Sequence, residues 1–149
     1  MRLRVIRIQR QRALRSGLPH HNMRAALFPL AVAEMGLLAE SLGGRRETVA
    51  GLAGAGDLQV TVTSGRNRLL GERIGLGLTG EEAFRELAAA GTTTEGYLAT
   101  AFGYRLAQRA IPAGDPVGRR FPLLDALYRV LYEGAPATEA LWGAVVGES

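Results

Sequence analysis

The sequence predicts an all-α domain over residues 22–149. Apolar residues recur at helical spacing through most of this range, and capping residues or glycines stand at the ends of the apolar runs. Paired β-branched runs with a short turn between them, which would indicate hairpins, are missing. A chain of 149 residues with 47% hydrophobic content has the size of one domain with one core.

The first half of the domain is predicted to contain two helices and one strand-like run. A long helix begins at Asn22, a plausible N-cap, and ends before the glycine pair 43–44. We expect Pro29 to kink or shorten this helix, because proline removes a helical hydrogen bond. A short helix follows at about 46–52, and the β-branched run 60–63 predicts a strand.

The second half reads as helical throughout. A helix is predicted at about 66–74, and Thr79 with Glu82 three positions later predicts a capping box that opens the next helix. Glycine favours the left-handed conformation that often follows a helix, so that helix should end at Gly91. The boundaries of three further helices are marked by a capping threonine, a terminating glycine and an initiating proline, which are Thr94, Gly134 and Pro136.

The charge is unevenly distributed along the chain. The net charge is +4, but seven of the 18 basic residues lie in the first 24 positions, where no acid occurs. We therefore predict that residues 1–21 form a basic arm outside the domain, either disordered or read from an incorrect start. Clustered arginines can bind nucleic acid or an anionic membrane, and they also occur in targeting presequences. The arm has no aromatic residue to stack on bases, so we expect neither partner.

Several kinds of site are excluded or disfavoured by composition. The chain has no cysteine, which excludes disulfides, thiolate zinc sites, iron–sulfur clusters and cysteine nucleophiles. His20 and His21 are the only histidines, and adjacent side chains diverge, so we predict no metal site. No stretch is apolar for long enough to cross a bilayer and no signal peptide is visible, so we expect a cytoplasmic protein.

Residues 75–80 match the G-x-G-x-x-G dinucleotide fingerprint literally. That fingerprint requires a buried strand before it, whereas the residues before Gly75 are predicted to be helical. We therefore interpret the glycines as the end of one helix and Thr79 as the cap of the next.

The stretch 51–68 contains a candidate phosphate site. Glycines at 51, 54 and 56 predict a loop that exposes backbone N–H groups, and Arg66 and Asn67 open a helix soon after. A helix N-terminus favours anions, and arginine binds oxyanions in a bidentate manner. On spacing alone, however, a glycine-rich turn with solvated arginines is the better interpretation.

The same stretch, Gly-Leu-Ala-Gly-Ala-Gly-Asp-Leu followed by Gly-Arg-Asn-Arg, resembles the signature of NAD(P)-dependent glycerol-3-phosphate dehydrogenases. Three further elements resemble that family in the same order, at residues 22–35, 95–97 and 122–134, so that the similarity covers about 21–146. Related dehydrogenases of the 6-phosphogluconate and hydroxyacid types lack the Gly-Arg-Asn-Arg element. The resemblance implies the family's helical substrate domain, with a fold like the 6-phosphogluconate dehydrogenase carboxy-terminal domain and no Rossmann domain present.

The resemblance also implies roles for individual residues. In the family this domain binds glycerol 3-phosphate or dihydroxyacetone phosphate against NAD or NADP, and hydride passes between substrate and cofactor. The substrate-binding positions are matched by Asp57, Gly65, Arg66 and Asn67. The cofactor-binding positions are matched by Arg66, Thr93 and Glu95.

Two departures from the family bear on catalysis. The general base of the family is a lysine, and this chain contains none, while arginine is too basic to replace it. The nucleotide-binding Rossmann domain is also missing from the sequence. We therefore assign no catalytic residue and expect the chain alone to be inactive and to bind the cofactor only weakly. A separate Rossmann-domain chain is the implied partner, and a homodimer stays open. The alternative is a catalytically dead structural or interaction remnant, or a small nucleic-acid-binding protein that acts through the basic arm.

Overall fold

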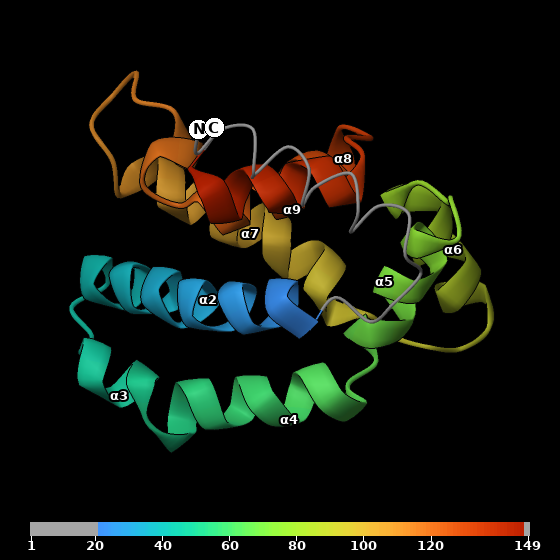
Figure 1. Ribbon diagram of the computed structural model, residues 1–149, viewed down its shortest axis with the longest axis horizontal. Coiled ribbons are helices and arrows are strands. Elements are labelled where there is room, and N and C mark those ends of the chain that lie inside the picture. The colour runs from blue at the N-terminus through green and yellow to red at the C-terminus, as the bar shows by residue number, and fades with distance from the viewer. Residues whose placement is uncertain (1–20, 148–149) are drawn as a thin grey trace.

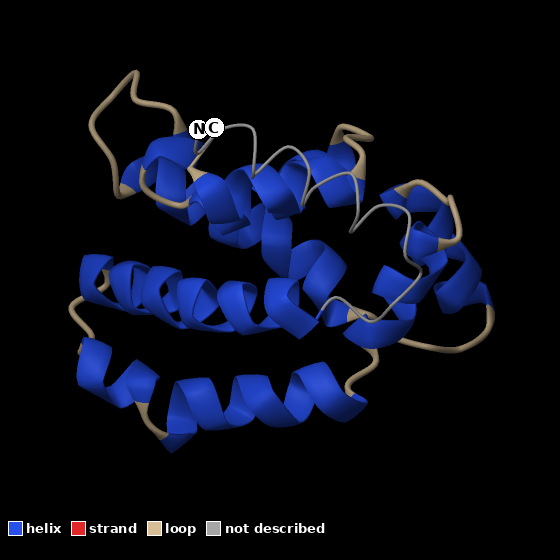
Figure 2. Cartoon of the chain, viewed as in Figure 1, coloured by secondary structure: helices blue, strands red, loops and turns tan. Residues whose placement is uncertain are grey.

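The computed structural model describes residues 21–147, and this part of the chain consists of helices joined by short links, without any strand (Figure 2). The predicted all-α class is therefore confirmed. Residues 1–20 of the predicted arm lie outside the described part. In chain order the elements are α2 (His21–Ser41), α3 (Arg46–Ala50), a π-helical turn η1 (Leu52–Gly56), α4 (Asp57–Ser64), α5 (Asn67–Gly75), α6 (Gly80–Ala89), α7 (Glu95–Arg109), a 3₁₀ turn η2 (Val117–Arg119), α8 (Pro122–Tyr132) and α9 (Ala137–Val146).

The long helix α2 forms a central layer (Figure 1). The segments α3 and α4 lie along one side of it, and α8 and α9 lie along the other, each in contact with α2 or with its neighbours. Helices α5 and α6 pair with each other at one end of the molecule. Contacts of α5 with α7, and of α6 with α8, join this pair to the other helices.

Three buried clusters hold the layers together by removing apolar surface from water. The cluster that matters for the site joins α5, α6, α7 and α8, and it consists of Leu70, Ala83, Leu87, Tyr97 and Leu131. A second cluster of mostly small residues lets α8 and α9 approach closely, and it consists of Ala126, Val130, Ala140 and Ala144. The third lies where α7 meets η2, and it consists of Ala107, Val117 and Phe121.

Helix α2 continues through Pro29 to Ser41, so the helix is not shortened there as the sequence suggested. The backbone hydrogen bond that Pro29 cannot donate destabilises the helix only locally. The helix packs along both of its long sides, and this burial offsets that cost.

The predicted strand at 60–63 is wrong, because these residues belong to α4. A strand needs a partner for its backbone groups, and the described residues offer none, whereas a helix bonds its own. Helical spacing also places Leu58 and Val62 together on the wall of an apolar hollow of about 560 Å³ between α4, α2 and α8. Local β-propensity is a weak preference, and here tertiary packing overrides it.

The interpretation of residues 75–80 is confirmed. Gly75 ends α5, and Gly77 turns the chain with a φ of +104°. The Thr79 hydroxyl accepts a hydrogen bond from the Glu82 N–H at 3.3 Å, and the Glu82 carboxylate accepts one from the Thr79 N–H at 2.9 Å. This is the predicted capping box, and no strand precedes it in the described chain.

Residues 21–147 contain neither a membrane-spanning helix nor a metal-binding cluster of side chains. No helix there has the length and hydropathy needed to span a membrane. No group of three or more acidic or histidine side chains there is arranged to hold a metal ion.

Candidate functional site

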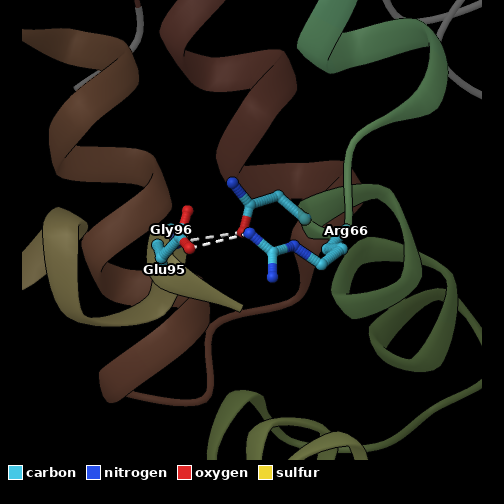
Figure 3. Close-up of polar contacts among 4 residues, drawn as sticks. Arg66, Glu95 and Gly96 are labelled. Carbon is cyan, nitrogen blue, oxygen red and sulfur yellow. Dashed lines mark hydrogen bonds and ion pairs between the residues drawn. The ribbon is translucent and has the colours of Figure 1, made fainter. Parts of the chain in front are cut away.

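The candidate site lies where the start of α5 meets the start of α7 (Figure 3). A guanidinium nitrogen of Arg66, the residue before α5, donates a hydrogen bond to the Glu95 carboxylate at 2.8 Å. The side-chain oxygen of Asn67 accepts a hydrogen bond from the backbone N–H of Gly96 at 2.9 Å. Each pair is separated by 29 residues in sequence, so tertiary folding brings these residues together.

An aromatic stack fixes the start of α7. The Tyr97 ring, in the first turn of α7, packs against Phe84 of α6 with ring centroids 4.4 Å apart, and against Tyr132 of α8 at 4.6 Å. The Tyr132 hydroxyl also donates a hydrogen bond to the Tyr97 carbonyl at 2.5 Å. Because Tyr97 is buried and held on two sides, Glu95 and Gly96 have a defined position before it.

Gly65 sets the position of Arg66. A side chain at Gly65 would place its Cβ 2.4 Å from the Thr61 carbonyl oxygen, which is closer than any real contact. The Gly65 N–H instead donates to that carbonyl at 2.7 Å and ends α4. Glycine therefore permits the tight link that delivers Arg66 and Asn67 to the start of α5.

The start of α7 is capped by a residue from another helix. Thr94 stands at the N-cap position, as predicted, but its side chain makes no capping bond, and its hydroxyl is buried with no partner. Asn67 takes the role instead by accepting from the Gly96 N–H. A methyl group on Gly96 would lie 2.8 Å from the Asn67 side-chain carbon, so only glycine allows this approach.

The predicted glycine loop before Asp57 is wrong. Residues 52–56 form a helical turn, in which the N–H groups of Gly54 and Gly56 both donate to the Gly51 carbonyl. Gly54 is buried, and a Cβ there would lie 2.1 Å from the Val49 carbonyl oxygen. The glycines therefore allow close packing of the turn on α3, and they do not form a phosphate cradle.

Asp57 lies in the first turn of α4 and is exposed. Arg66 follows the far end of the same helix, roughly 12 Å away along its axis for a rise of about 1.5 Å per residue. Within residues 21–147, the Asp57 side chain makes no hydrogen bond or ion pair. Arg66, Asn67 and Glu95 therefore come together in the structure, whereas Asp57 stands apart from them.

Thr93 and Glu95 line a hollow of about 400 Å³ beside the start of α7. Phe84 of α6 and Leu98 of α7 form its apolar wall. Two of the three predicted cofactor-binding positions therefore share one concave surface. The Arg66 guanidinium reaches Glu95 from α5, and this contact joins the hollow to the predicted phosphate-binding pair.

The Arg66–Glu95 ion pair is open to solvent, with side-chain exposures of 57% and 69%. Exposed pairs of this kind contribute only about 0–1 kcal/mol to stability. The pair is therefore available for exchange with a charged ligand. No role was predicted for Gly96 from the sequence, although its place directly after Glu95 in the first turn of a helix is the signal that could have identified it.

Comparison with known proteins agrees with the motif resemblance. Residues 14–142 match the family described as NAD-dependent glycerol-3-phosphate dehydrogenase C-terminus. The chain is 40% identical over 121 residues to NADP(+)-dependent glycerol-3-phosphate dehydrogenase of Archaeoglobus fulgidus, covering 81% of this chain and 34% of that protein. It is 43% identical over 122 residues to glycerol-3-phosphate dehydrogenase [NAD(P)+] of Symbiobacterium thermophilum, covering 80% and 33%. The chain thus spans about a third of the length of these curated relatives.

Proposed function

Since this chain belongs to the family of the NAD-dependent glycerol-3-phosphate dehydrogenase C-terminus, we propose that it acts as the substrate-binding half of such an enzyme. Its ligand is sn-glycerol 3-phosphate or dihydroxyacetone phosphate. Arg66 and Asn67 bind the phosphate, and Gly65 sets the position of this pair. Asp57, at the other end of α4, provides a further substrate contact apart from the phosphate-binding pair. Arg66, Thr93 and Glu95 face the nicotinamide cofactor, NAD or NADP.

The observation that carries this proposal is the meeting of Arg66 and Asn67 with Glu95 at the two helix starts. Charged side chains that serve only solubility usually lie on separate surfaces. Helix α5 has no acid in its first turn, so its own sequence offers no anion to the amides there. An arginine guanidinium and a side-chain amide at one helix start are together suited to a phosphate.

The reaction of a whole dehydrogenase needs more than these residues supply. The cofactor provides the hydride chemistry, and a Rossmann domain, which is built on a parallel sheet, binds it. Residues 21–147 contain no strand, and the sequence contains no lysine to act as the base. We propose that this half contributes substrate binding and orientation, and that hydride transfer also requires a nucleotide-binding domain.

Titration of the purified chain with sn-glycerol 3-phosphate, followed by calorimetry or NMR, tests the proposal. Replacing Arg66 with alanine should weaken binding by about 10- to 150-fold, the equivalent of about 1.5–3 kcal/mol for a charge-assisted hydrogen bond. Arg109→Ala removes an exposed arginine at the far end of α7 and serves as the matched control. Equal affinity in the parent and the Arg66 variant, or no binding by the parent, would contradict the proposal.

A further inference from the structure

We propose that Gly96 is the positioning residue for the Asn67 amide, because its backbone N–H, approached closely only in the absence of a side chain, fixes which end of that amide faces the ligand. This inference rests on the proposed function and assigns separate tasks to the two ends of one amide. The oxygen of Asn67 holds the start of α7. Its nitrogen is left to donate to the ligand's phosphate.

The orientation of the Asn67 amide follows from its partner. The backbone N–H of Gly96 is a donor, so the atom 2.9 Å from it must be the acceptor oxygen, Oδ1. This bond satisfies an N–H in the first turn of α7 that has no acceptor within its own helix. The amide cannot rotate by 180° without placing two donors against each other.

The other end of the amide has no protein partner. Within residues 21–147, the Asn67 side chain makes no further hydrogen bond, and it is only half-buried. The Nδ2 group therefore offers two N–H donors beside the Arg66 guanidinium, which comes from the adjacent residue. Both groups donate hydrogen bonds and neither accepts them, which suits the oxygen atoms of a phosphate.

Gly96 makes this arrangement possible. A Cβ at position 96 would lie 2.8 Å from Oδ1 and 2.9 Å from Nδ2 of Asn67, so any side chain would displace the whole amide. The φ of Gly96 lies outside the left-handed range, so backbone strain gives no reason for glycine here. The close approach of Asn67 is the physical reason.

An aspartate at position 67 separates the two tasks. One carboxylate oxygen still accepts from the Gly96 N–H, and negative charge at a helix N-terminus is favourable. The other oxygen replaces the donor with an acceptor that repels phosphate. The Asn67→Asp variant should therefore retain the fold and lose the ligand, whereas Asn67→Ala should lose both the cap and the ligand.

The experiment measures thermal unfolding and the affinity for inorganic phosphate and sn-glycerol 3-phosphate in the full purified chain. Asn67→Asp should unfold near the parent temperature and bind at least about tenfold more weakly, since charge-assisted bonds are the strong ones. Gly96→Ala should also weaken binding at least about tenfold by displacing Asn67. Two controls should leave affinity unchanged: Gln108→Glu makes the same charge change at an exposed position of α7, and Gly103→Ala adds a methyl group whose nearest neighbour is 3.6 Å away.

The outcomes separate this inference from the proposed function. Binding that depends on Arg66 but not on Asn67 and Gly96 overturns the inference and leaves the proposed function standing. An Asn67→Asp variant that is as unstable as Asn67→Ala overturns the capping role. No binding by the parent chain overturns both.

Discussion

The Glu34 carboxylate, in the middle of α2, accepts a hydrogen bond from the backbone N–H of Leu123 in α8 at 2.7 Å. Its second oxygen accepts from the N–H of Leu124 at 2.9 Å. Pro122 begins α8 and has no N–H, so Glu34 receives the first two N–H groups that the helix presents. Glu34 is 4% exposed. Its two hydrogen bonds hold α2 against α8, the helix whose Tyr132 packs on Tyr97.

Replacing Glu34 with alanine should lower the free energy of unfolding by about 3 kcal/mol, because two buried N–H groups lose their acceptors. Urea unfolding followed by circular dichroism measures this change. Glu47→Ala, at an exposed position of α3, is the matched control and should shift stability by less than about 0.5 kcal/mol. A shift for Glu34→Ala as small as that of the control would show that the contact does not stabilise the fold.

The same carboxyl should give the chain a pH-dependent stability. Burial raises the pKa of Glu34 above its ordinary value, although the N–H groups of Leu123 and Leu124 act in the opposite direction, and the charge of Asp125 raises it further. A carboxyl with a raised folded-state pKa binds its proton more tightly in the folded chain. Its contribution is therefore fully present below the unfolded value of 4.5 and is lost as the pH rises through the folded pKa.

Glu34→Gln cannot titrate, and comparison with it isolates this effect. The stability of the parent relative to Glu34→Gln should fall as the pH is raised from about 4 to 7. Chemical unfolding of both proteins at several pH values provides the measurement. A difference that stays constant, or that grows with pH, would mean that the hydrogen bonds outweigh burial and that the pKa is not raised.

Replacing Gly80 with alanine and replacing Gly71 with alanine should change the stability of the fold in opposite directions. A Cβ at Gly80, the first residue of α6, would lie 2.3 Å from the Leu131 carbonyl oxygen, so alanine there must push α6 away from α8. Gly71 lies exposed inside α5 with nothing within 4 Å of a new Cβ. We expect Gly80→Ala to destabilise by about 1–3 kcal/mol and Gly71→Ala to stabilise by about 0.5–1 kcal/mol. Thermal unfolding of the two variants tests this prediction. Unfolding temperatures that shift in the same direction would contradict it.

The sequence predicted those features that depend on local chemistry. Thr79 and Glu82 are close in sequence and form their capping box from local hydrogen bonds alone. Residues 60–63 were misassigned because their β-branched side chains indicate a local preference, whereas the hollow against α2 and α8 decides their conformation. A local capping signal therefore predicts structure more reliably than a segment whose conformation depends on distant packing.

The site shows the same limit. The family resemblance drew attention to Arg66, Asn67 and Glu95, which the structure brings together. Nothing in the sequence indicated that Asn67 would cap α7 in place of Thr94, because the two helix starts meet only through tertiary packing. The glycines before Asp57 looked like a loop, because a buried glycine in a helical turn and a flexible glycine look alike in sequence.

The purified chain alone should show no oxidation of NADH or NADPH that depends on dihydroxyacetone phosphate. The sequence has no lysine, and an arginine does not give up its proton at neutral pH. A spectrophotometric assay that follows the absorbance of NADH or NADPH tests this. With about micromolar protein, it would detect turnover at ordinary enzyme rates. Turnover that follows the protein through successive purification steps would contradict the prediction.

Glu95 should weaken phosphate binding as long as no cofactor is present. Its carboxylate occupies the Arg66 guanidinium at 2.8 Å, so an anion entering the site must displace or share this partner and meets a like charge beside it. Glu95→Gln removes that charge and should strengthen phosphate binding by about two- to fivefold, the range that an exposed ion pair allows. The gain should shrink as salt is added, because screening weakens interactions between exposed charges. Glu81→Gln breaks an exposed ion pair with Arg85 on α6 and controls for the change in net charge. Calorimetric titration of inorganic phosphate at low and high salt gives both readings. If Glu95→Gln weakens binding instead, the carboxylate orients the guanidinium for the ligand and does not compete with it.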